Sequence, residues 1–138
     1  MSFAGMNYWA ILAAAVAGFL FGGAWYGLLS KQWLASIDKS TEDIQKTGML
    51  VPMLVSAVCL LVMAWILSGI MGHLGPGQIT VRNGLISGAF CWFGFVATTI
   101  ATNHAYQGAK RALTLIDAGH WLGVLLMQGA VIGWLGVR

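Results

Sequence analysis

Residues 50–71 read LVPMLVSAVCLLVMAWILSGIM and contain no charged side chain. Because a helix rises about 1.5 Å per residue, about 20 apolar residues cross the roughly 30 Å hydrocarbon layer of a membrane. Three other stretches are apolar over a comparable length, at about residues 7–29, 84–102 and 113–135. We therefore predict four membrane spans within a single integral membrane domain that covers residues 1–138.

The composition of the chain also indicates a membrane protein. Hydrophobic residues make up 59% and charged residues 8% of the sequence, and the mean hydropathy is +0.80, whereas soluble domains carry roughly 25% charged residues. The strands of a membrane barrel alternate in polarity at every second residue, and the four stretches do not alternate in this way. The predicted fold class is all-α, with four transmembrane helices in an antiparallel bundle.

The basic residues are distributed unequally over the connectors. The first and third loops hold Lys31, Lys39, Lys46, Lys110 and Arg111, and the opposite side holds Arg82 and Arg138. Since cytoplasmic loops carry the excess of Lys and Arg, we expect loops one and three in the cytoplasm and both termini outside. Residues 1–6 lack the basic charge of a secretory signal, so we expect the first span to be retained.

The first loop is the longest connector and contains a helical pattern. Trp33, Leu34 and Ile37 are apolar at helical spacing, and Ser40 with Asp43 forms a capping-box pattern. We expect a short helix on the membrane surface in this loop. Asp43 would then lie in the first turn of a following helix, where the helix dipole favours negative charge.

Small residues recur along the first and fourth spans. In the first span Ala10, Ala14, Gly18 and Gly22 are four residues apart, and the fourth span has Gly119, Gly123, Gly129 and Gly133 on one side. Small residues at this spacing allow helix backbones to approach closely in a membrane. They predict tight helix packing and favour association with a further copy of the chain or with another membrane protein.

Polar residues gather on the other side of the fourth span. Asp117, His120 and Gln128 share that side with Trp121 and Val124 at 100° per residue. The third span carries a polar stripe as well and ends in more polar residues; the residues concerned are Thr98, Thr102, Asn103 and His104. Polar groups are costly in lipid and usually face a protein interior or a cavity, so these seven side chains are the candidate polar or ligand site.

Two interpretations of Asp117 are open. It lies about one turn inside the start of its span, where the helix dipole favours a carboxylate and where Lys110 or Arg111 is within reach, so it can be a structural cap or an interhelix hydrogen-bond partner. It can also move a proton, an ion or a ligand, with His120 one turn deeper as its hydrogen-bond partner. Gln128 is expected to form a hydrogen bond across helices.

The sequence contains no motif that indicates a cofactor or a catalytic reaction. His104, Asp117 and His120 lack a family-defining metal spacing such as H-E-x-x-H, and we predict no metal site. Cys59 and Cys91 are both in the middle of spans, where a free thiol behaves as a small apolar residue. We expect no cofactor, no enzymatic activity and, since no basic cluster alternates with aromatic residues, no binding of nucleic acid.

The tripeptides Trp25-Tyr26-Gly27 and Trp92-Phe93-Gly94 are similar and lie about half the chain apart. Their spans would run in the same direction across the membrane. A duplicated two-helix unit and a chance similarity of three residues both account for this observation.

Four short motifs, spread over nearly the whole chain, carry a resemblance to a known family. They are Trp25-Tyr26-Gly27; Lys31 with Trp33; Gly94-Phe95-Val96-Ala97-Thr98-Thr99 with Thr102-Asn103; and Leu115-Ile116-Asp117-Ala118-Gly119. Together they resemble a family of small, uncharacterised bacterial membrane proteins that share a domain of unknown function. The chain departs from the family pattern at Leu28, where many relatives have proline, and at His120, where an aromatic residue such as Tyr is expected.

The resemblance implies a bacterial inner-membrane bundle of four helices and brings no activity with it. Two classes of function are therefore compared. The first is a structural or interaction component that self-associates or joins a larger membrane complex, and this is the class we expect. The second is a small transporter or channel for protons, ions or a small solute, in which the polar groups around Asp117 and His120 line the path.

Overall fold

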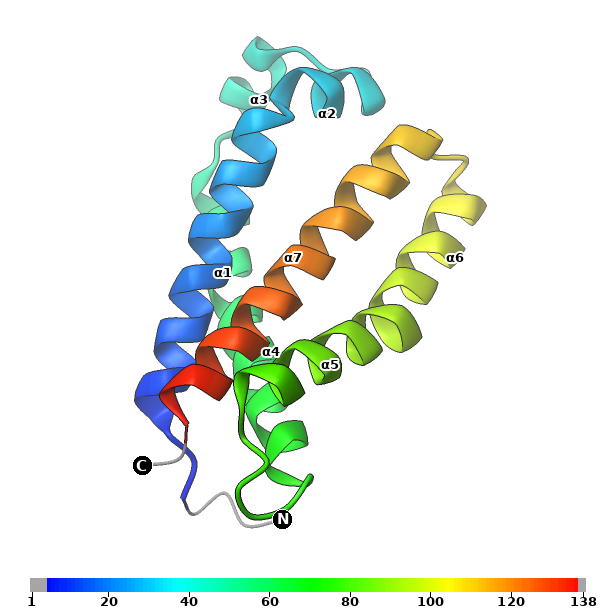
Figure 1. Cartoon of the computed structure of the whole chain (residues 1–138). Helices are drawn as coiled ribbons and strands as arrows, with labels where there is room; N and C mark the ends of the chain where they lie inside the picture. The colour runs from blue at the N-terminus through cyan, green and yellow to red at the C-terminus, as the bar shows by residue number, and fades with distance from the viewer. Residues whose placement is uncertain (1–4, 137–138) are drawn as a thin grey trace.

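The computed structural model describes residues 5–136, and every regular element in that range is a helix. Four long helices have the length and hydropathy of membrane spans, and two short helices lie in the first connector (Figure 1). The elements are α1 (Tyr8–Leu28), α2 (Ser30–Ser36), α3 (Thr41–Thr47), α4 (Leu50–Gly72), α5 (Val81–Cys91), η1 (Trp92–Ala97), α6 (Thr98–Gln107) and α7 (Arg111–Leu135). Consecutive spans run in opposite directions, which confirms the predicted all-α antiparallel fold.

Local signals explain where the helices begin and end. The Asn7 side chain accepts a hydrogen bond from the Ala10 amide and caps α1, and the Thr80 hydroxyl caps α5 in the same way through Asn83. Gly108 has a φ of 63°, a left-handed conformation that glycine adopts without strain, and it ends α6. The third span therefore runs from Val81 to Gln107 and is longer than the apolar stretch 84–102, because polar residues at both of its ends remain helical.

The first connector contains two short helices. The expected apolar helix is α2, which includes Trp33 and Leu34, and α3 follows it. Ser40 and Asp43 form the reciprocal hydrogen bonds of a capping box at the start of α3. In Figure 1 both short helices cover the end of the bundle that is opposite the two termini.

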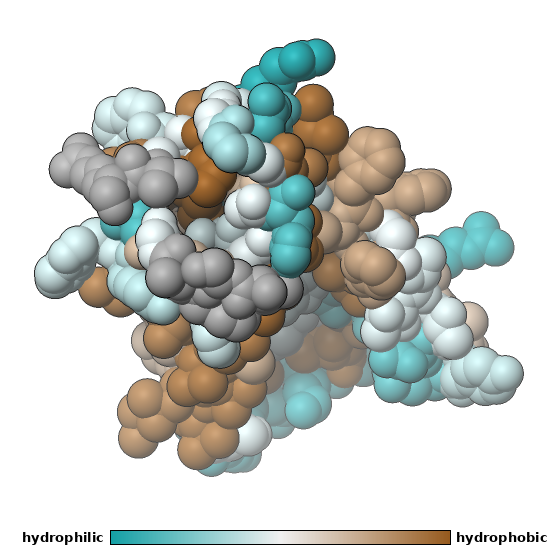
Figure 2. All heavy atoms as spheres, turned by 90° about the horizontal axis from the view of Figure 1, so that it is seen from below, coloured by the Kyte–Doolittle hydropathy of each residue, from teal (hydrophilic) through white to brown (hydrophobic). Residues whose placement is uncertain are grey.

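The helix α7 lies at the centre of the bundle and packs against α1, α4 and α5. The buried core lies between these helices and includes Ile11, Ala14, Ala64, Leu67, Leu125 and Ile132. Large apolar side chains are exposed over the outer surface of α4, where Leu54 and Val58 are examples. Figure 2 shows hydrophobic residues reaching the outline of the bundle on several sides, as contact with lipid requires.

Glycine residues set the distance between α5 and α7. Gly84 and Gly129 meet backbone to backbone, and Gly133 meets the backbone of Thr80. A methyl group on Gly88 would lie 2.6 Å from the carbonyl oxygen of Leu125. These crossings leave no room for a side chain, so the two helices contact each other mainly through their main chains.

The small residues of α1 face α7 and α4. Ala10, Ala14 and Gly18 are buried in the bundle, and Gly22 lies against the His120 ring. On α7, Gly119 faces Trp25 and Gly123 faces Phe21. The small residues of both helices thus pack within one chain, and large aromatic side chains occupy part of the space that they leave.

Candidate functional site

The Asp117 carboxylate lies at the end of the bundle that α2 and α3 cover, where side chains from three spans meet. Its Oδ1 atom accepts a hydrogen bond of 2.7 Å from the hydroxyl of Tyr26 on α1. Its Oδ2 atom lies 3.7 Å from Nε2 of His104 on α6, and the Nδ1 atom of that ring lies 2.9 Å from the Thr114 hydroxyl. Asp117 therefore links α1, α6 and α7, as the interpretation of an interhelix partner requires.

Two tryptophan side chains fix the main chain on either side of Asp117. The Trp25 indole donates a hydrogen bond of 3.0 Å to the carbonyl oxygen of Ile116, and the Trp92 indole donates one of 2.8 Å to that of Ala118. Both indole N–H groups thereby have a hydrogen-bond acceptor, which lipid would not provide. The two similar tripeptides noted in the sequence thus supply equivalent contacts to α7 from opposite neighbours.

His120 is 7% exposed and lies among aromatic rings. Its ring centroid is 4.8 Å from that of Tyr26 and 4.6 Å from that of Trp121, and a Cβ atom at position 22 would lie 2.8 Å from its Nε2 atom. The Nδ1 atom forms no hydrogen bond within residues 5–136. The hydrogen bond between Asp117 and His120 that one of the two interpretations invoked is not formed in the structure, where the carboxylate contacts Tyr26 and His104.

Both residues line a cavity of about 640 Å³. The cavity lies between α1, α4 and α7 and is bordered by α2 and α3. Apolar and aromatic side chains form most of its wall. The lining side chains that bear on the chemistry are Phe19, Tyr26, Trp33, Lys39, Met53, Ser56, Leu60, Asp117, His120 and Trp121. A carboxylate and a histidine thus lie at one end of an apolar cavity of the size usual for small-molecule sites, about 300–1,000 Å³.

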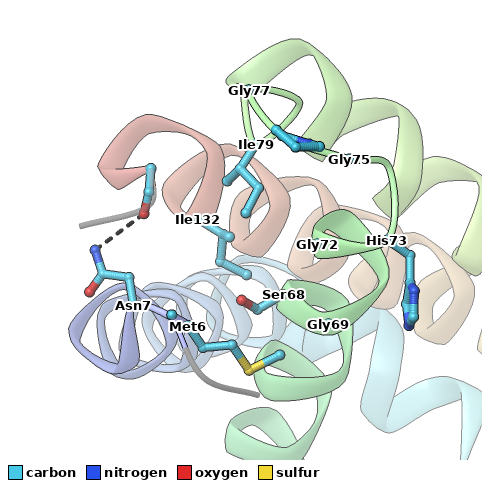
Figure 3. A pocket seen from close by; sticks show the side chains of 13 residues that line it. Met6, Asn7, Ser68, Gly69, Gly72, His73, Gly75, Gly77, Ile79 and Ile132 are labelled. Carbon is cyan, nitrogen blue, oxygen red and sulfur yellow. Dashed lines mark hydrogen bonds between the residues drawn. The ribbon is translucent and has the colours of Figure 1, made fainter. Parts of the chain in front are cut away.

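A second cavity, of about 530 Å³, lies at the opposite end of the bundle beside the chain termini. Figure 3 shows that glycines of α4 and of the following loop form much of its wall, together with Met6, Ser68 and His73. The Asn7 amide donates a hydrogen bond of 3.2 Å to the Gly136 carbonyl oxygen and joins the start of α1 to the end of α7. No acidic side chain lines this cavity among the described residues.

Several predicted site residues lie away from Asp117. The hydroxyls of Thr98 and Thr102 are exposed and donate to carbonyl oxygens of their own helix, those of Gly94 and Thr98. Asn103 is exposed as well. The structure shows no contact between these three side chains and Asp117, and of the polar residues predicted on the third span it brings only His104 to the carboxylate.

The π-helical segment η1 explains this difference. A π turn adds one residue to a helical turn, so side chains after it are rotated relative to those before it. Gly84 and Gly88 precede the segment and face α7, and an uninterrupted α-helix would carry that face on to Thr98 and Thr102. Beyond this segment both threonines are exposed, and His104 reaches Thr114 and Asp117 of α7.

Gln128 lies deeper in the bundle and is fully buried. Its Nε2 atom donates a hydrogen bond of 3.0 Å to the Leu60 carbonyl oxygen on α4, and its Oε1 atom has no hydrogen-bond partner within residues 5–136. The expected hydrogen bond across helices is therefore present. It lies beyond the inner end of the larger cavity, where Leu60 and Gly18 form the wall.

Lys110 does not pair with Asp117. Its ammonium group contacts the Asp38 carboxylate and donates to the carbonyl oxygen of Ala35, which ties the third connector to α2. Arg111 is exposed and forms no ion pair among the described residues. Within residues 5–136, no three His, Cys, Asp or Glu side chains lie close enough together to hold a metal ion.

Sequence reasoning missed Tyr26, Thr114 and the two indole donors. Tyr26 was part of a recognised tripeptide, but its partner is 91 positions away and no local pattern indicates it. The packed structure shows that Trp25, near the end of its span, and Trp92, in the middle of the third span, both donate to the main chain around Asp117.

A protein-family model described as "Protein of unknown function (DUF1761)" matches residues 9–133, which include Tyr26, His104, Asp117 and His120. The chain belongs to this family. The resemblance to a domain of unknown function is thereby confirmed, and the family covers all four spans. Comparisons with curated proteins and with solved structures gave no match.

Proposed function

We propose that the protein binds a small amphipathic molecule within the membrane, in the larger cavity. The observation that carries this proposal is that Asp117 and His120 line a space of about 640 Å³ with mostly apolar walls. Small-molecule sites combine such walls with a few polar groups that orient the ligand. A polar ligand head would lie at Asp117 and its apolar body along α1 and α4.

The arrangement supports binding or carriage rather than an open channel. Leu60 lines the larger cavity and Ser68 lines the smaller one, eight residues further along α4, or about 12 Å at 1.5 Å per residue. Between the two cavities, Ala14, Ala64, Val124 and Gln128 are all fully buried. Passage of a molecule from one cavity to the other requires this layer to open. A transporter with this structure would therefore be a carrier whose helices move, and not an open channel.

Photolabelling tests the binding function. The protein in phosphatidylcholine nanodiscs is irradiated with 3-azioctanol, a neutral photoreactive alcohol, and the modified residues are identified by mass spectrometry. We expect saturable labelling at Asp117 and Tyr26, and we expect Ser56→Trp to remove it because the indole would fill the cavity. Val58→Trp places the same side chain on the exposed surface of α4 and is the matched control.

Labelling that does not saturate, or that Ser56→Trp and Val58→Trp affect equally, would contradict a cavity site. Both variants add an indole to α4. They differ in whether the added side chain meets the cavity or the lipid.

A structural or interaction role is the second candidate, and the third span favours it. The helix α6 has no buried residue, and Thr98, Thr102 and Asn103 are exposed along it. Polar side chains in a span usually form hydrogen bonds with a neighbouring helix, so this surface fits a second copy of the chain or another membrane protein. In this role the small residues of α1 and α7 contribute less, because they pack within the chain.

Native mass spectrometry from nanodiscs tests this second role. We expect a homo-oligomer that Asn103→Leu converts to monomer, while Phe90→Leu, on an exposed apolar position of α5, leaves it intact. A strictly monomeric wild-type protein would remove self-association from consideration.

We further propose a bacterial inner membrane as the location, with loops one and three in the cytoplasm, on the basis of the basic residues in those loops.

A further inference from the structure

Aromatic rings form part of the wall of the larger cavity. Phe19, Tyr26, Trp33, His120 and Trp121 all line it. The ring centroids of Trp33 and Tyr26 are 5.8 Å apart, those of Tyr26 and His120 are 4.8 Å apart, and those of His120 and Trp121 are 4.6 Å apart. Trp33, Tyr26, His120 and Trp121 therefore form a row of neighbouring rings that begins at α2 and ends on α7.

The acidic side chain of the cavity lies beside its aromatic rings. Asp117 and Lys39 are the charged side chains that line it among the described residues. Lys39 is exposed at the turn between α2 and α3, and its charge acts on the Asp43 carboxylate nearby. Asp117 is 23% exposed, and neither Lys110 nor Arg111 neutralises it. A ligand that enters the aromatic part of the cavity thus meets a carboxylate without a permanent cationic partner.

We propose that the ligand of this cavity is a lipophilic organic cation, bound by the Asp117 carboxylate and the adjacent faces of the aromatic rings. This inference rests on the proposed binding function and names the class of ligand. Aromatic rings attract cations through their quadrupole, most strongly when the cation is desolvated, and quaternary ammonium groups are recognised in this way. The apolar wall of α4, with Met53 and Leu60, accommodates the body of the ligand.

Other ligand classes fit less well. An anion would be repelled by Asp117, and a neutral amphiphile would gain no charge attraction from the carboxylate. A hard metal cation needs several oxygen ligands, whereas the lining offers one carboxylate among mostly apolar groups. The organic cation is the class whose charge and apolar surface both match the cavity.

A pair of ions with the same shape and opposite charge tests the proposal. Tetraphenylphosphonium and tetraphenylborate are titrated into protein labelled with 5-fluorotryptophan in phosphatidylcholine nanodiscs, and ¹⁹F NMR follows each indole separately. We expect the phosphonium ion to shift the Trp33 and Trp121 resonances saturably and to leave Trp9, at the far end of α1, unchanged. We expect the affinity of the borate ion for these sites to be lower by a factor of about ten or more.

Asp117→Asn keeps the shape of the side chain and removes its charge. We expect this variant to bind the two ions with affinities within about threefold of each other. Glu42→Gln is the matched control, because it removes a carboxylate from α3 that does not line the cavity, and it should retain the phosphonium preference. Unchanged Trp9 and Trp134 resonances verify that each variant is folded.

Trp33→Leu provides a second test that does not alter a membrane span. Trp33 lies on α2 and lines the cavity. Loss of its ring should weaken phosphonium binding by about two- to thirtyfold, which is the range of a cation–π contact. The Trp121 resonance follows the binding. If both ions bind equally at Trp33 and Trp121, the cation proposal is overturned while the binding function stands. If neither ion shifts these resonances, both are overturned.

Discussion

At the scale of single residues, the Asp117 carboxylate, which stands alone in its apolar span, links α7 to α1 and α6. The position of Asp117 was predictable, because a charge in an apolar span is costly and therefore conspicuous in the sequence. Its partners were not predictable, because helical periodicity gives the face of a residue and not the helix that meets it. Tyr26 and His104 come from two different spans, and the His120 ring, three residues further along α7, forms no hydrogen bond with the carboxylate.

Removing the Tyr26 hydroxyl should destabilise the bundle. Tyr26→Phe deletes the hydrogen bond of 2.7 Å to Asp117 and leaves the ring in place. We expect the free energy of unfolding in mixed micelles to fall by about 1–2 kcal/mol. Tyr8→Phe removes a hydroxyl from an exposed position of the same helix and should change it by less than about 0.5 kcal/mol. Equal effects of the two substitutions would contradict the role assigned to this contact.

The capping box of α3 predicts a dependence on pH. Hydrogen bonds from the Ser40 amide and hydroxyl, with a smaller effect of Lys39, lower the pKa of Asp43 below its ordinary value of about 3.8. Because the pKa is lower in the folded state, the carboxylate stabilises α3 above pH 3.8, and this stabilisation is lost as the pH falls through the lowered pKa.

Hydrogen exchange of the α3 amides, measured by NMR and corrected for the intrinsic rate, should show this loss of protection at acid pH. In Asp43→Asn the same amides should exchange faster at neutral pH, and their protection should change little with pH in this range. A wild-type helix whose protection is constant down to pH 3 would refute the assignment.

At the scale of helices, the spans and their packing faces followed from the sequence, and the irregular segment did not. Apolar length gave the four spans, and the four-residue spacing of small residues gave the sides on which helices approach. The π-helical segment Trp92–Ala97 has no recognised signal, since its glycine and aromatic residues also occur in regular spans. It rotates the second half of the third span, and for this reason the predicted stripe of Thr98 and Thr102 did not reach Asp117.

The crossing of α5 and α7 should not tolerate a methyl group. Gly129→Ala places a Cβ atom against the backbone of Gly84, which cannot move aside as a flexible side chain can. We expect the free energy of unfolding to fall by about 1–3 kcal/mol, as for other substitutions that overfill a packed interior. Gly27→Ala, in α1 with open space around it, is the control and should change stability by no more than about 0.5 kcal/mol. Tolerance of Gly129→Ala would show that the two helices can separate.

At the scale of the whole molecule, the structure brings the two basic connectors to the same end of the bundle. Lys110 of the third connector contacts Asp38 beside α2, and the termini lie together at the other end (Figure 1). An even number of spans explains this arrangement, which the sequence already implied. The cavities were not predictable, because their volume depends on how side chains from several helices fill the space between them.

Cysteine labelling tests the sidedness of the chain. In a background without Cys59 and Cys91, Leu74→Cys lies in the connector after α4, and Gln45→Cys lies on the exposed surface of α3. We expect a membrane-impermeant maleimide to label Leu74→Cys in intact cells and Gln45→Cys only after permeabilisation, because the basic connectors should be cytoplasmic. The reverse pattern would invert the predicted orientation.

The contact between Asn7 and Gly136 has a consequence for how the chain can be rearranged. The two residues are joined by a single hydrogen bond, so a short peptide would connect the ends of the described chain without moving α1 or α7. The chain could then be opened at Gly108, whose glycine turn lies at the surface at the other end. Such a circular permutant would insert its four helices in a new order, α7 first, and should still assemble the same bundle, because each interhelix contact is kept.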